Sequence, residues 1–456
     1  MLENIILNKI KSIIPKERLS TQAEDLIAAS YDASRQTARP DMVIKPLTAE
    51  EISAVIKIAN EHSIPVYPRG AATSLTGGAV PTKGGIVIDT TRMNRIISIN
   101  KTDLMAIVEP GVVIGNFQEA VEKEGLFYPP DPASADTCTI GGNIATCAGG
   151  LRCIKYGVTR DYVMGLEVVL ADGSIIHTGS YTLKCSTGYD LTRLFVGSEG
   201  TLGIFTKINL KLTIKPESQE TIIAFYNNVN TAIDSAQMVL AEGILPTALE
   251  FMDETSTKAV QKHHTEFTMP ENTKAILLIE IDGNKSDATR LADKTYELLS
   301  QNNSLKAIKA GNRAEAKSLW AVRKAISPAL YSLTSYKISE DISIPLGKVK
   351  EMVAAIKDLE SAYNIQMAIF GHLGDGNLHV NFLPIAPAQN ETLEKAIEQL
   401  FKETVCLGGT LSGEHGIGIT KSKYLSMAIS SREMQLMKDI KKLFDPKNIL
   451  NPGKIF

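Results

Sequence analysis

The 456-residue sequence predicts an α+β fold with two domains and a C-terminal segment, and three observations support this. Helix and strand patterns alternate from the start of the chain. A stretch rich in Pro, Gly, Ala, Ser and Thr interrupts them at residues 129–150. A second alternation of strands and helices begins near Pro216. We expect the first domain over residues 1–215, the second over 216–400 and the segment over 401–456.

The first domain is expected to begin with a short amphipathic helix that packs on its own protein rather than on a membrane. A helix is then expected at residues 49–63, followed by strands at 64–68, 85–90, 95–100 and 104–110. Residues 165–179 predict a hairpin with Asp172 and Gly173 at its turn. The stretch 129–150 is too long and too apolar for a solvated linker, which favours backbone wrapped around a ligand.

The second domain is expected to combine a sheet with helices in a ferredoxin-like pattern. Strands are expected at residues 221–226, 247–253 and 275–282, with helices near 231–242 and 286–301. The C-terminal segment predicts a helix that ends at the Asp-Pro and Asn-Pro pairs of the sequence FDPKNILNPGK.

Composition excludes several classes of protein. The net charge of −3 and the pI near 6.2 give no electrostatic reason to expect nucleic acid. No apolar run approaches the ~20 residues that span a bilayer, and the N-terminus does not look like a secretory signal. The five cysteines form no CxxC pair and no iron–sulfur spacing. We therefore expect reduced thiols in a cytoplasmic protein.

Two histidines in the sequence GHLGDGNLH, from Gly371 to His379, indicate a metal site. If Asp375 and Gly376 form a two-residue turn, His372 and His379 lie directly opposite each other on one face of a hairpin. We expect this hairpin at the far edge of the second domain's sheet. Glu414 follows in the sequence SGEHGIG, and two imidazoles with a carboxylate suit a divalent metal with an open position. A purely structural metal would instead require a fourth protein ligand, often a cysteine.

Three glycine-rich loops lie in the first domain, at residues 68–80, 140–150 and 197–203. Backbone N–H groups in such loops bind anions such as a pyrophosphate. The first loop alone is equally typical of a structural glycine turn, and no loop fits the Walker or the GxGxxG pattern. Together the three loops indicate one large cofactor that extends across the domain.

The ordered set PRGAATSLTGG, EPGV, PPDPASADTCTIGGNIATCAGG, KYGVTRDYV and LFVGSEGTLG resembles the FAD-binding domain of vanillyl-alcohol-oxidase-type flavoproteins. Its continuation through GHLGDGNLH, SGEHGIG and FDPKNILNPGK is similar to their metal-dependent branch. That branch includes FAD-linked D-lactate dehydrogenases, the FAD subunit of glycolate oxidase and D-2-hydroxyglutarate dehydrogenases. The resemblance runs from about Pro40 to Phe456. It implies a vanillyl-alcohol-oxidase-type FAD-binding domain, a ferredoxin-like cap domain and a helical C-terminal segment.

The resemblance also implies which residues contact FAD. They are Arg69, Gly70, Thr73, Ser74, Leu75, Thr76, Gly77, Gly78, Pro132, Ala133, Ser134, Gly141, Gly142, Ala148, Glu199, Gly200 and Ile204. Some relatives attach the flavin covalently through a histidine in the first loop. This chain has Ala71-Ala72-Thr73-Ser74 there, so non-covalent FAD is expected.

By the same resemblance, His372, His379 and Glu414 are ligands of a divalent metal and His415 is the catalytic base. Zn²⁺, Fe²⁺ and Mn²⁺ all suit this set. Arg323 matches the substrate-binding arginine, and its planar fork binds a carboxylate bidentately. Lys337 is a second candidate cation, although relatives space their lysine differently from the following aspartate.

The resemblance implies FAD- and metal-dependent oxidation of D-lactate to the 2-oxo acid, with hydride transfer to flavin N5. The chain has neither a dinucleotide fingerprint nor clustered cysteines, so reduced FAD is expected to pass its electrons to a partner protein, a quinone or oxygen. The chain resembles, in size and in lacking iron–sulfur cysteines, the lactate dehydrogenases that work with an electron-transferring flavoprotein, and this resemblance implies such a partner. Alternatives are a glycolate oxidase FAD subunit and a D-2-hydroxyglutarate dehydrogenase. A non-catalytic flavin relay subunit, a flavin-fold transferase or a metal-independent oxidase would leave the metal-binding residues unexplained.

Overall fold

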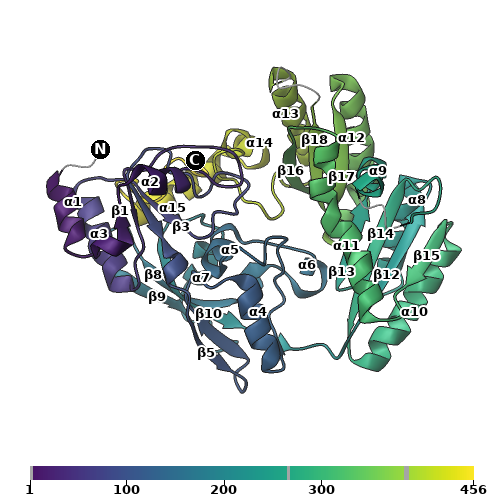
Figure 1. Ribbon diagram of the computed structural model, residues 1–456, viewed down its shortest axis with the longest axis horizontal. Coiled ribbons are helices and arrows are strands. Elements are labelled where there is room, and N and C mark those ends of the chain that lie inside the picture. The colour runs from purple at the N-terminus through teal and green to yellow at the C-terminus, as the bar shows by residue number, and fades with distance from the viewer. Residues whose placement is uncertain (1–3, 264–267, 385–389) are drawn as a thin grey trace. The chain divides into compact units, whose positions relative to one another are not determined.

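The computed structural model describes residues 4–263, 268–384 and 390–456 (Figure 1). Helices and strands alternate throughout, and the α+β prediction is confirmed. The chain divides into two compact units. The first unit contains residues Met1–Gly149, Gly157–Lys215 and Glu414–Phe456, and the second contains Gly150–Tyr156 and Pro216–Gly413.

The first unit contains two main sheets. One has the strand order β1 (Leu19–Ser20), β2 (Met42–Ile44), β4 (Ile86–Asp89), β3 (Val66–Arg69), and its last three strands are parallel. The other is antiparallel, in the order β5 (Ile96–Asn100), β6 (Met105–Val108), β10 (Ile204–Lys211), β8 (Val163–Val169), β9 (Ile175–Gly179). A two-stranded ribbon pairs β7 (Leu126–Phe127) with β11 (Thr213–Ile214).

The helices of the first unit pack around these sheets. They are α1 (Asn4–Lys11), α2 (Ala23–Ala28), α3 (Ala49–Glu61), α4 (Ile114–Lys123), α5 (Ile140–Thr146), α7 (Leu191–Phe195), α14 (Leu425–Ala428) and α15 (Ser431–Phe444). Ile10 of α1 and Ile52 of α3 are fully buried in one core with Ile86 and Ile88 of β4. The N-terminal helix therefore packs on its own protein, as its pattern predicts.

Helix α5 was not expected in the glycine-rich stretch. It forms because Thr139 caps its N-terminus by accepting a hydrogen bond from the Gly142 N–H, and Cys147 ends it in the left-handed region, at φ 53°. Gly141 is required by close packing, since a Cβ there would lie 2.6 Å from the Pro110 side chain.

The second unit is built on a seven-stranded antiparallel sheet. Its strand order is β15 (Lys306–Lys309), β12 (Ser218–Tyr226), β14 (Ala275–Gly283), β13 (Ala248–Met252), β17 (Gln366–His372), β18 (Asn377–Leu383), β16 (Ile338–Ser343). Its helices are α6 (Cys153–Tyr156), α8 (Val229–Ala241), α9 (Glu254–His263), α10 (Lys285–Gln301), α11 (Arg313–Ala329), α12 (Val349–Tyr363) and α13 (Asn390–Cys406). The strands and helices expected at residues 221–301 are all present.

Helices α9 and α11 pack on the sheet through one apolar core. Val260 of α9 and Val322 of α11 are fully buried there with Ile223, Met252 and Leu278 of three strands. Residues two apart on a strand share a face, so the core places Glu250 and Phe370 on the side covered by these helices.

The hairpin formed by β17 and β18 has a different register from the one we predicted. His372 pairs with Asn377 and Phe370 pairs with His379, because a four-residue loop, Leu373–Gly376, replaces the two-residue turn. Gly376 occupies the left-handed position that closes this loop, at φ 79°. The shift is by two residues, so both histidines stay on the same face, as diagonal neighbours.

The hairpin is also not at the edge of the sheet. Residues Ile338–Ser343 form β16, which pairs outside β18 along its whole length. The prediction was wrong because the sequence YKISEDISIP carries three charges, and it was not interpreted as a strand.

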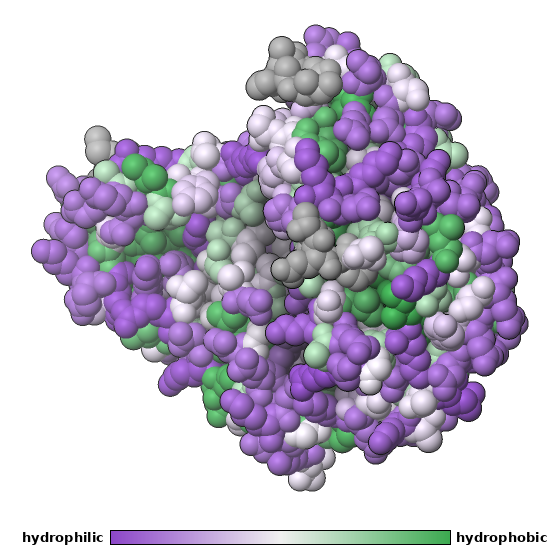
Figure 2. Space-filling model, turned by 45° about the vertical axis from the view of Figure 1, so that its right-hand side comes forward, coloured by the Kyte–Doolittle hydropathy of each residue, from purple (hydrophilic) through white to green (hydrophobic). Residues whose placement is uncertain are grey.

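No described helix is long and apolar enough to cross a bilayer. The face of the molecule drawn in Figure 2 is largely hydrophilic, with hydrophobic residues in scattered patches. This agrees with the ordinary composition of the chain.

Replacing Gly376 by alanine is expected to destabilise the second unit more than replacing Gly243. Both glycines have positive φ, 79° and 74°, which costs alanine about 1 kcal/mol at either position. At Gly376 the new Cβ would also lie 1.9 Å from the Ile344 carbonyl oxygen, whereas nothing lies within 4 Å at Gly243. Overpacking of this kind adds about 1–3 kcal/mol. Thermal unfolding of both variants tests this, and equal losses of melting temperature would contradict the loop geometry.

Candidate functional site

Four buried polar side chains form a stripe across four adjacent strands of the second unit. Glu250 on β13 lies directly opposite His372 on β17, and His379 on β18 lies directly opposite Asp341 on β16. Each side chain is at most 9% exposed. Apolar sheet faces do not bury such groups without compensation, so the stripe marks a specialised site.

The two histidines at the centre of the stripe face each other. Their ring centroids are 5.2 Å apart and the rings are nearly perpendicular, at 87°. A nitrogen of His372 and a nitrogen of His379 lie within 4.8 Å of each other. Two ligand atoms on one metal ion are separated by about 3–4 Å, so a small rotation of either ring would bring both onto one ion.

Glu250 holds two partners with its two oxygen atoms. Oε1 lies 2.6 Å from Nδ1 of His372, and Oε2 accepts a hydrogen bond from Nε of Arg323 at 2.5 Å. Burial alone would raise the pKa of Glu250, but the neighbouring His372 and Arg323 outweigh it and lower the pKa to about 2. The carboxylate is therefore ionised at neutral pH.

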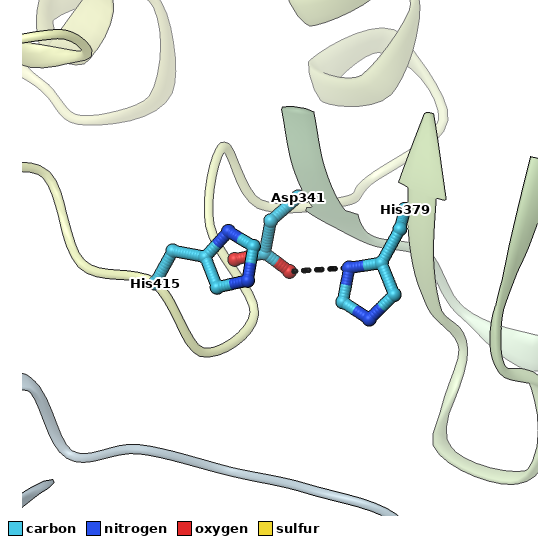
Figure 3. Close-up of side chains that lie close together, drawn as sticks. All are labelled: Asp341, His379 and His415. Atoms are coloured by element: carbon cyan, nitrogen blue, oxygen red, sulfur yellow. Dashed lines mark ion pairs between the residues drawn. The ribbon is translucent and has the colours of Figure 1, made fainter. Parts of the chain in front are cut away.

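Asp341 connects the hairpin to the end of the second unit. Its carboxylate accepts hydrogen bonds from Asn377 Nδ2 at 2.5 Å, Ser412 Oγ at 2.8 Å and the Gly413 N–H at 2.9 Å. Figure 3 shows the same carboxylate directed at the His379 ring, with Oδ1 4.0 Å from Nδ1. Gly413 is bonded to Glu414, whose Cα can lie only about 3.8 Å further along the chain. Asp341 thus fixes the point from which Glu414 and His415 begin.

In the first unit, the loops expected to bind the cofactor also hold the segment around His415. The Thr76 hydroxyl donates to the His415 carbonyl at 3.2 Å, and the Ile419 N–H donates to the Thr76 carbonyl at 2.7 Å. Glu199 accepts hydrogen bonds from the N–H groups of Ile417 at 2.7 Å and Gly418 at 2.8 Å. The first and third loops therefore position the backbone of the residue predicted to be the base.

Two buried charged residues of the first unit, Glu199 and Lys454, interact with each other. Burial raises the pKa of Glu199, although the Ile417 and Gly418 N–H groups and Lys454 oppose the shift. Burial lowers the pKa of Lys454 to about 8, while Glu199 opposes that shift. Lys454 donates to the Val80 carbonyl at 2.8 Å, so the C-terminal residues hold the end of the first loop as well.

The three glycine-rich loops converge within the first unit. Asn451 donates to the carbonyl oxygens of Gly78, in the first loop, and Glu199, in the third. A Cβ on Gly70 would lie 2.2 Å from the Thr139 hydroxyl, so the first loop also contacts the start of the second. The predicted FAD-binding residues occupy these loops, α5 and the short segment Pro132–Ser134 before it.

Two observations bear on whether a cofactor fits there. Within the described part of the chain, Asn143 Nδ2 and Ser198 Oγ are buried and have no hydrogen-bond partner, and each belongs to one of the loops. Such atoms normally have one, and a bound polar ligand would provide it. The guanidinium of Arg69, by contrast, donates to the carbonyls of Tyr31 at 2.8 Å and Ala28 at 3.1 Å. Its side chain thus supports the loop, and a cofactor contact there would use its backbone.

The two candidate cations of the second unit differ in their surroundings. Arg323 is 13% exposed, belongs to the stripe through Glu250 and lies 4.8 Å from the centre of the Phe370 ring. Lys337 donates to the Ser327 hydroxyl at 2.7 Å and lies 5.1 Å from the centre of the Tyr331 ring. Arg323 is thus connected to His372 through the Glu250 carboxylate.

Sequence reasoning missed Glu250, Asp341 and Asn377. A signal existed for Glu250, because it is an acid inside the apolar strand expected at residues 247–253, whereas Asp341 follows another acid in a charged segment that was not interpreted as a strand. All five residues of Ala248–Met252 are buried, including the glutamate. An acid that interrupts an apolar strand is typical of a functional site.

Comparison with known proteins identifies the family of this chain. Residues 215–455 match the C-terminal domain of FAD linked oxidases, and residues 40–179 match an FAD binding domain. The chain belongs to the FAD-linked oxidase family. It is 44% identical to "Glycolate oxidase subunit GlcD" of Bacillus subtilis, over 94% of this chain and 91% of that protein. It is 35% identical to "D-lactate dehydrogenase" of Anaerostipes hadrus, over 99% and 97% respectively.

Among solved structures, p-cresol methylhydroxylase with bound substrate has the same fold. The TM-score is 0.81 at 18% identity, with 99% of this chain and 96% of that chain covered. The predicted vanillyl-alcohol-oxidase-type fold and the predicted family are confirmed. The protein is thus an FAD-dependent oxidoreductase by family.

Replacing Glu199 by glutamine is expected to loosen the backbone that follows His415. Glutamine offers one acceptor and one donor where two N–H groups now bind, so one hydrogen bond is lost, at a cost of about 1–3 kcal/mol. The amides of Ile417 and Gly418 should then exchange hydrogen faster. A Glu167→Gln variant, whose carboxylate binds Thr206 and Lys207, serves as the control. Unchanged exchange at residues 415–419 would show that Glu199 does not hold this segment.

Proposed function

We propose that the protein oxidises D-lactate to the corresponding 2-oxo acid, using non-covalently bound FAD and one divalent metal ion. The buried histidine pair is the observation that carries this proposal, because a flavoprotein that only relays electrons needs no such pair. The relative named D-lactate dehydrogenase, aligned over almost the whole chain, supports the choice of substrate.

In this proposal His372, His379 and Glu414 hold the metal. The two imidazoles are suitable nitrogen donors for such a metal. Glu414 follows directly on Gly413, whose N–H donates to Asp341, and Asp341 lies opposite His379 on the sheet. Zn²⁺, Fe²⁺ and Mn²⁺ all suit two imidazoles and a carboxylate. A metal bound there supplies Lewis acidity that favours loss of the proton from the substrate hydroxyl.

The three converging loops would hold FAD. The N–H groups of Gly70 and Thr73–Gly78 suit a pyrophosphate, and the uncompensated Asn143 and Ser198 side chains suit polar atoms of the cofactor. FAD supplies an acceptor for the hydride of the substrate Cα. The absence of histidine at residues 69–78 supports a non-covalent cofactor.

The remaining steps belong to side chains of this protein. His415 accepts the hydroxyl proton on a ring nitrogen, while Thr76 and Glu199 fix its backbone. Arg323 binds the substrate carboxylate through its terminal nitrogens, since Nε already donates to Glu250. Lys337 would contribute a second positive charge only after leaving Ser327.

We propose an electron-transferring flavoprotein as the electron acceptor. The sequence contains no dinucleotide fingerprint and no clustered cysteines for iron–sulfur centres. Electrons must therefore leave the flavin to another molecule. Reduction of a purified electron-transferring flavoprotein by the substrate-reduced protein tests this, and reduction of only quinone or oxygen would contradict it.

Glycolate is the second candidate substrate, because the relative with 44% identity carries the name of a glycolate oxidase subunit. Glycolate lacks the methyl group of lactate. One methyl group in an apolar pocket changes the specificity constant by about 10–200-fold, so the two acids can be ranked by rate.

Anaerobic mixing of the purified holoprotein with D-lactate, L-lactate, glycolate and D-2-hydroxyglutarate tests the proposal. D-lactate is expected to bleach the flavin absorbance fastest. Removing the metal with a chelator should abolish bleaching, and adding Zn²⁺, Fe²⁺ or Mn²⁺ should restore it. Bleaching at the original rate after verified metal loss, or no bleaching by any of these acids, would refute the proposed function.

The His415→Asn variant is expected to slow flavin reduction by about 10²–10⁴-fold, the usual contribution of a general base, while it retains the metal. The His379→Ala variant should lose the metal as well as activity. His177→Ala is the matched control, because that side chain is 71% exposed on β9 and has no place in the proposed site. An active His415→Asn variant would remove this residue from the mechanism.

A further inference from the structure

Glu250 occupies a position where a charge is costly. It lies in the middle of β13 between Leu249 and Phe251, and its side chain is fully buried. Nothing in the formation of a strand requires a carboxylate there, and an uncompensated one would destabilise the sheet. Its two partners, His372 and Arg323, come from strand and helix segments that are 122 and 73 residues away in sequence.

The contact with His372 determines which ring nitrogen binds a metal. The carboxylate oxygen Oε1 lies 2.6 Å from Nδ1 of His372 and accepts a hydrogen bond from it, so Nδ1 carries the proton. The lone pair then belongs to Nε2. Metal-bound histidines almost always have such a partner on the other nitrogen, and it makes them stronger ligands.

The contact with Arg323 determines how that guanidinium is presented. Oε2 of Glu250 accepts only from Nε, at 2.5 Å, and the guanidinium lies 4.8 Å from the centre of the Phe370 ring. In the described residues, no hydrogen bond reaches Nη1 or Nη2. One edge of the guanidinium is thus fixed, and its terminal pair keeps the geometry that binds a carboxylate.

We infer that Glu250 is a positioning residue that couples the metal site to the substrate-carboxylate site. One oxygen sets the tautomer of His372, and the other orients Arg323. The inference rests on the proposed function, since it assigns the metal to His372 and the carboxylate to Arg323. Without this buried carboxylate, neither the His372 imidazole nor the Arg323 guanidinium would be correctly oriented.

The Glu250→Gln variant separates this role from simple support of the fold. Glutamine keeps the size of the side chain but has one acceptor, so it cannot accept from both partners. We expect metal affinity, measured by competition with a chelator, to fall about 10–100-fold. The KM for D-lactate should rise at saturating metal, with a smaller change in kcat.

Asp253→Asn is the matched control. Asp253 is also fully buried, lies three residues further along the chain and pairs with Lys357 and Ser256 rather than with the stripe. This variant should lose stability without a change in metal affinity or KM. Equal losses of metal affinity in both variants would reduce Glu250 to a structural role and overturn the inference.

A measurement on the unmodified holoprotein covers the case in which Glu250→Gln does not fold. The chain has only seven histidines, so ¹⁵N-labelled histidine gives few NMR signals, and His372→Gln identifies one of them. We expect His372 to be protonated on Nδ1, and protonation on Nε2 would overturn the inference.

If His372→Ala and His379→Ala bind metal as tightly as the unmodified protein, the proposed function itself fails. If they lose metal while Glu250→Gln keeps its affinity and KM, only the inference fails.

Discussion

The antiparallel register of β13, β17, β18 and β16 is the constraint on which the candidate site depends. It places Glu250 opposite His372 and Asp341 opposite His379, all on one face of the sheet. A shift by one residue in any of the three pairings would turn one of these groups to the other face. The ladders of β16 with β18 and of β17 with β18, six and seven residue pairs long, hold that register together with the three-pair ladder of β13 with β17. The candidate site therefore lies on the sheet rather than on a flexible loop.

This arrangement also explains how the sheet tolerates buried charge. The Glu250 carboxylate lies between His372 and Arg323, and Asp341 accepts hydrogen bonds from Asn377, Ser412 and Gly413. Each carboxylate is therefore compensated by hydrogen-bond donors or by a neighbouring positive charge. Breaking such a cluster by removing one partner typically costs about 3–5 kcal/mol, so the polar stripe also contributes to the stability of the sheet.

Sequence reasoning predicted correctly that His372 and His379 share one face of a hairpin, because both lie in one local segment. The turn was predicted incorrectly, but the resulting error in register is two residues. An even shift leaves His372 and His379 on the same face of the hairpin. Glu250 and Asp341 were missed because the histidines opposite them belong to strands far away in the sequence. The strand order of the sheet is what makes these strands neighbours. Helix α5 was missed because its sequence contains two glycines, which are poor helix formers, although Thr139 caps its N-terminus. Most strands were predicted, and so were helices α1, α3, α8, α10 and α15, since their apolar periodicity is local.

Anomalous X-ray diffraction from crystals of the holoprotein tests the central claim most directly. We predict one strong anomalous peak, about 2.0–2.2 Å from a nitrogen of His372, a nitrogen of His379 and an oxygen of Glu414. The absorption edge at which the peak appears identifies the metal. A flavin-loaded, catalytically active crystal that has no anomalous peak between the two histidines would contradict the account.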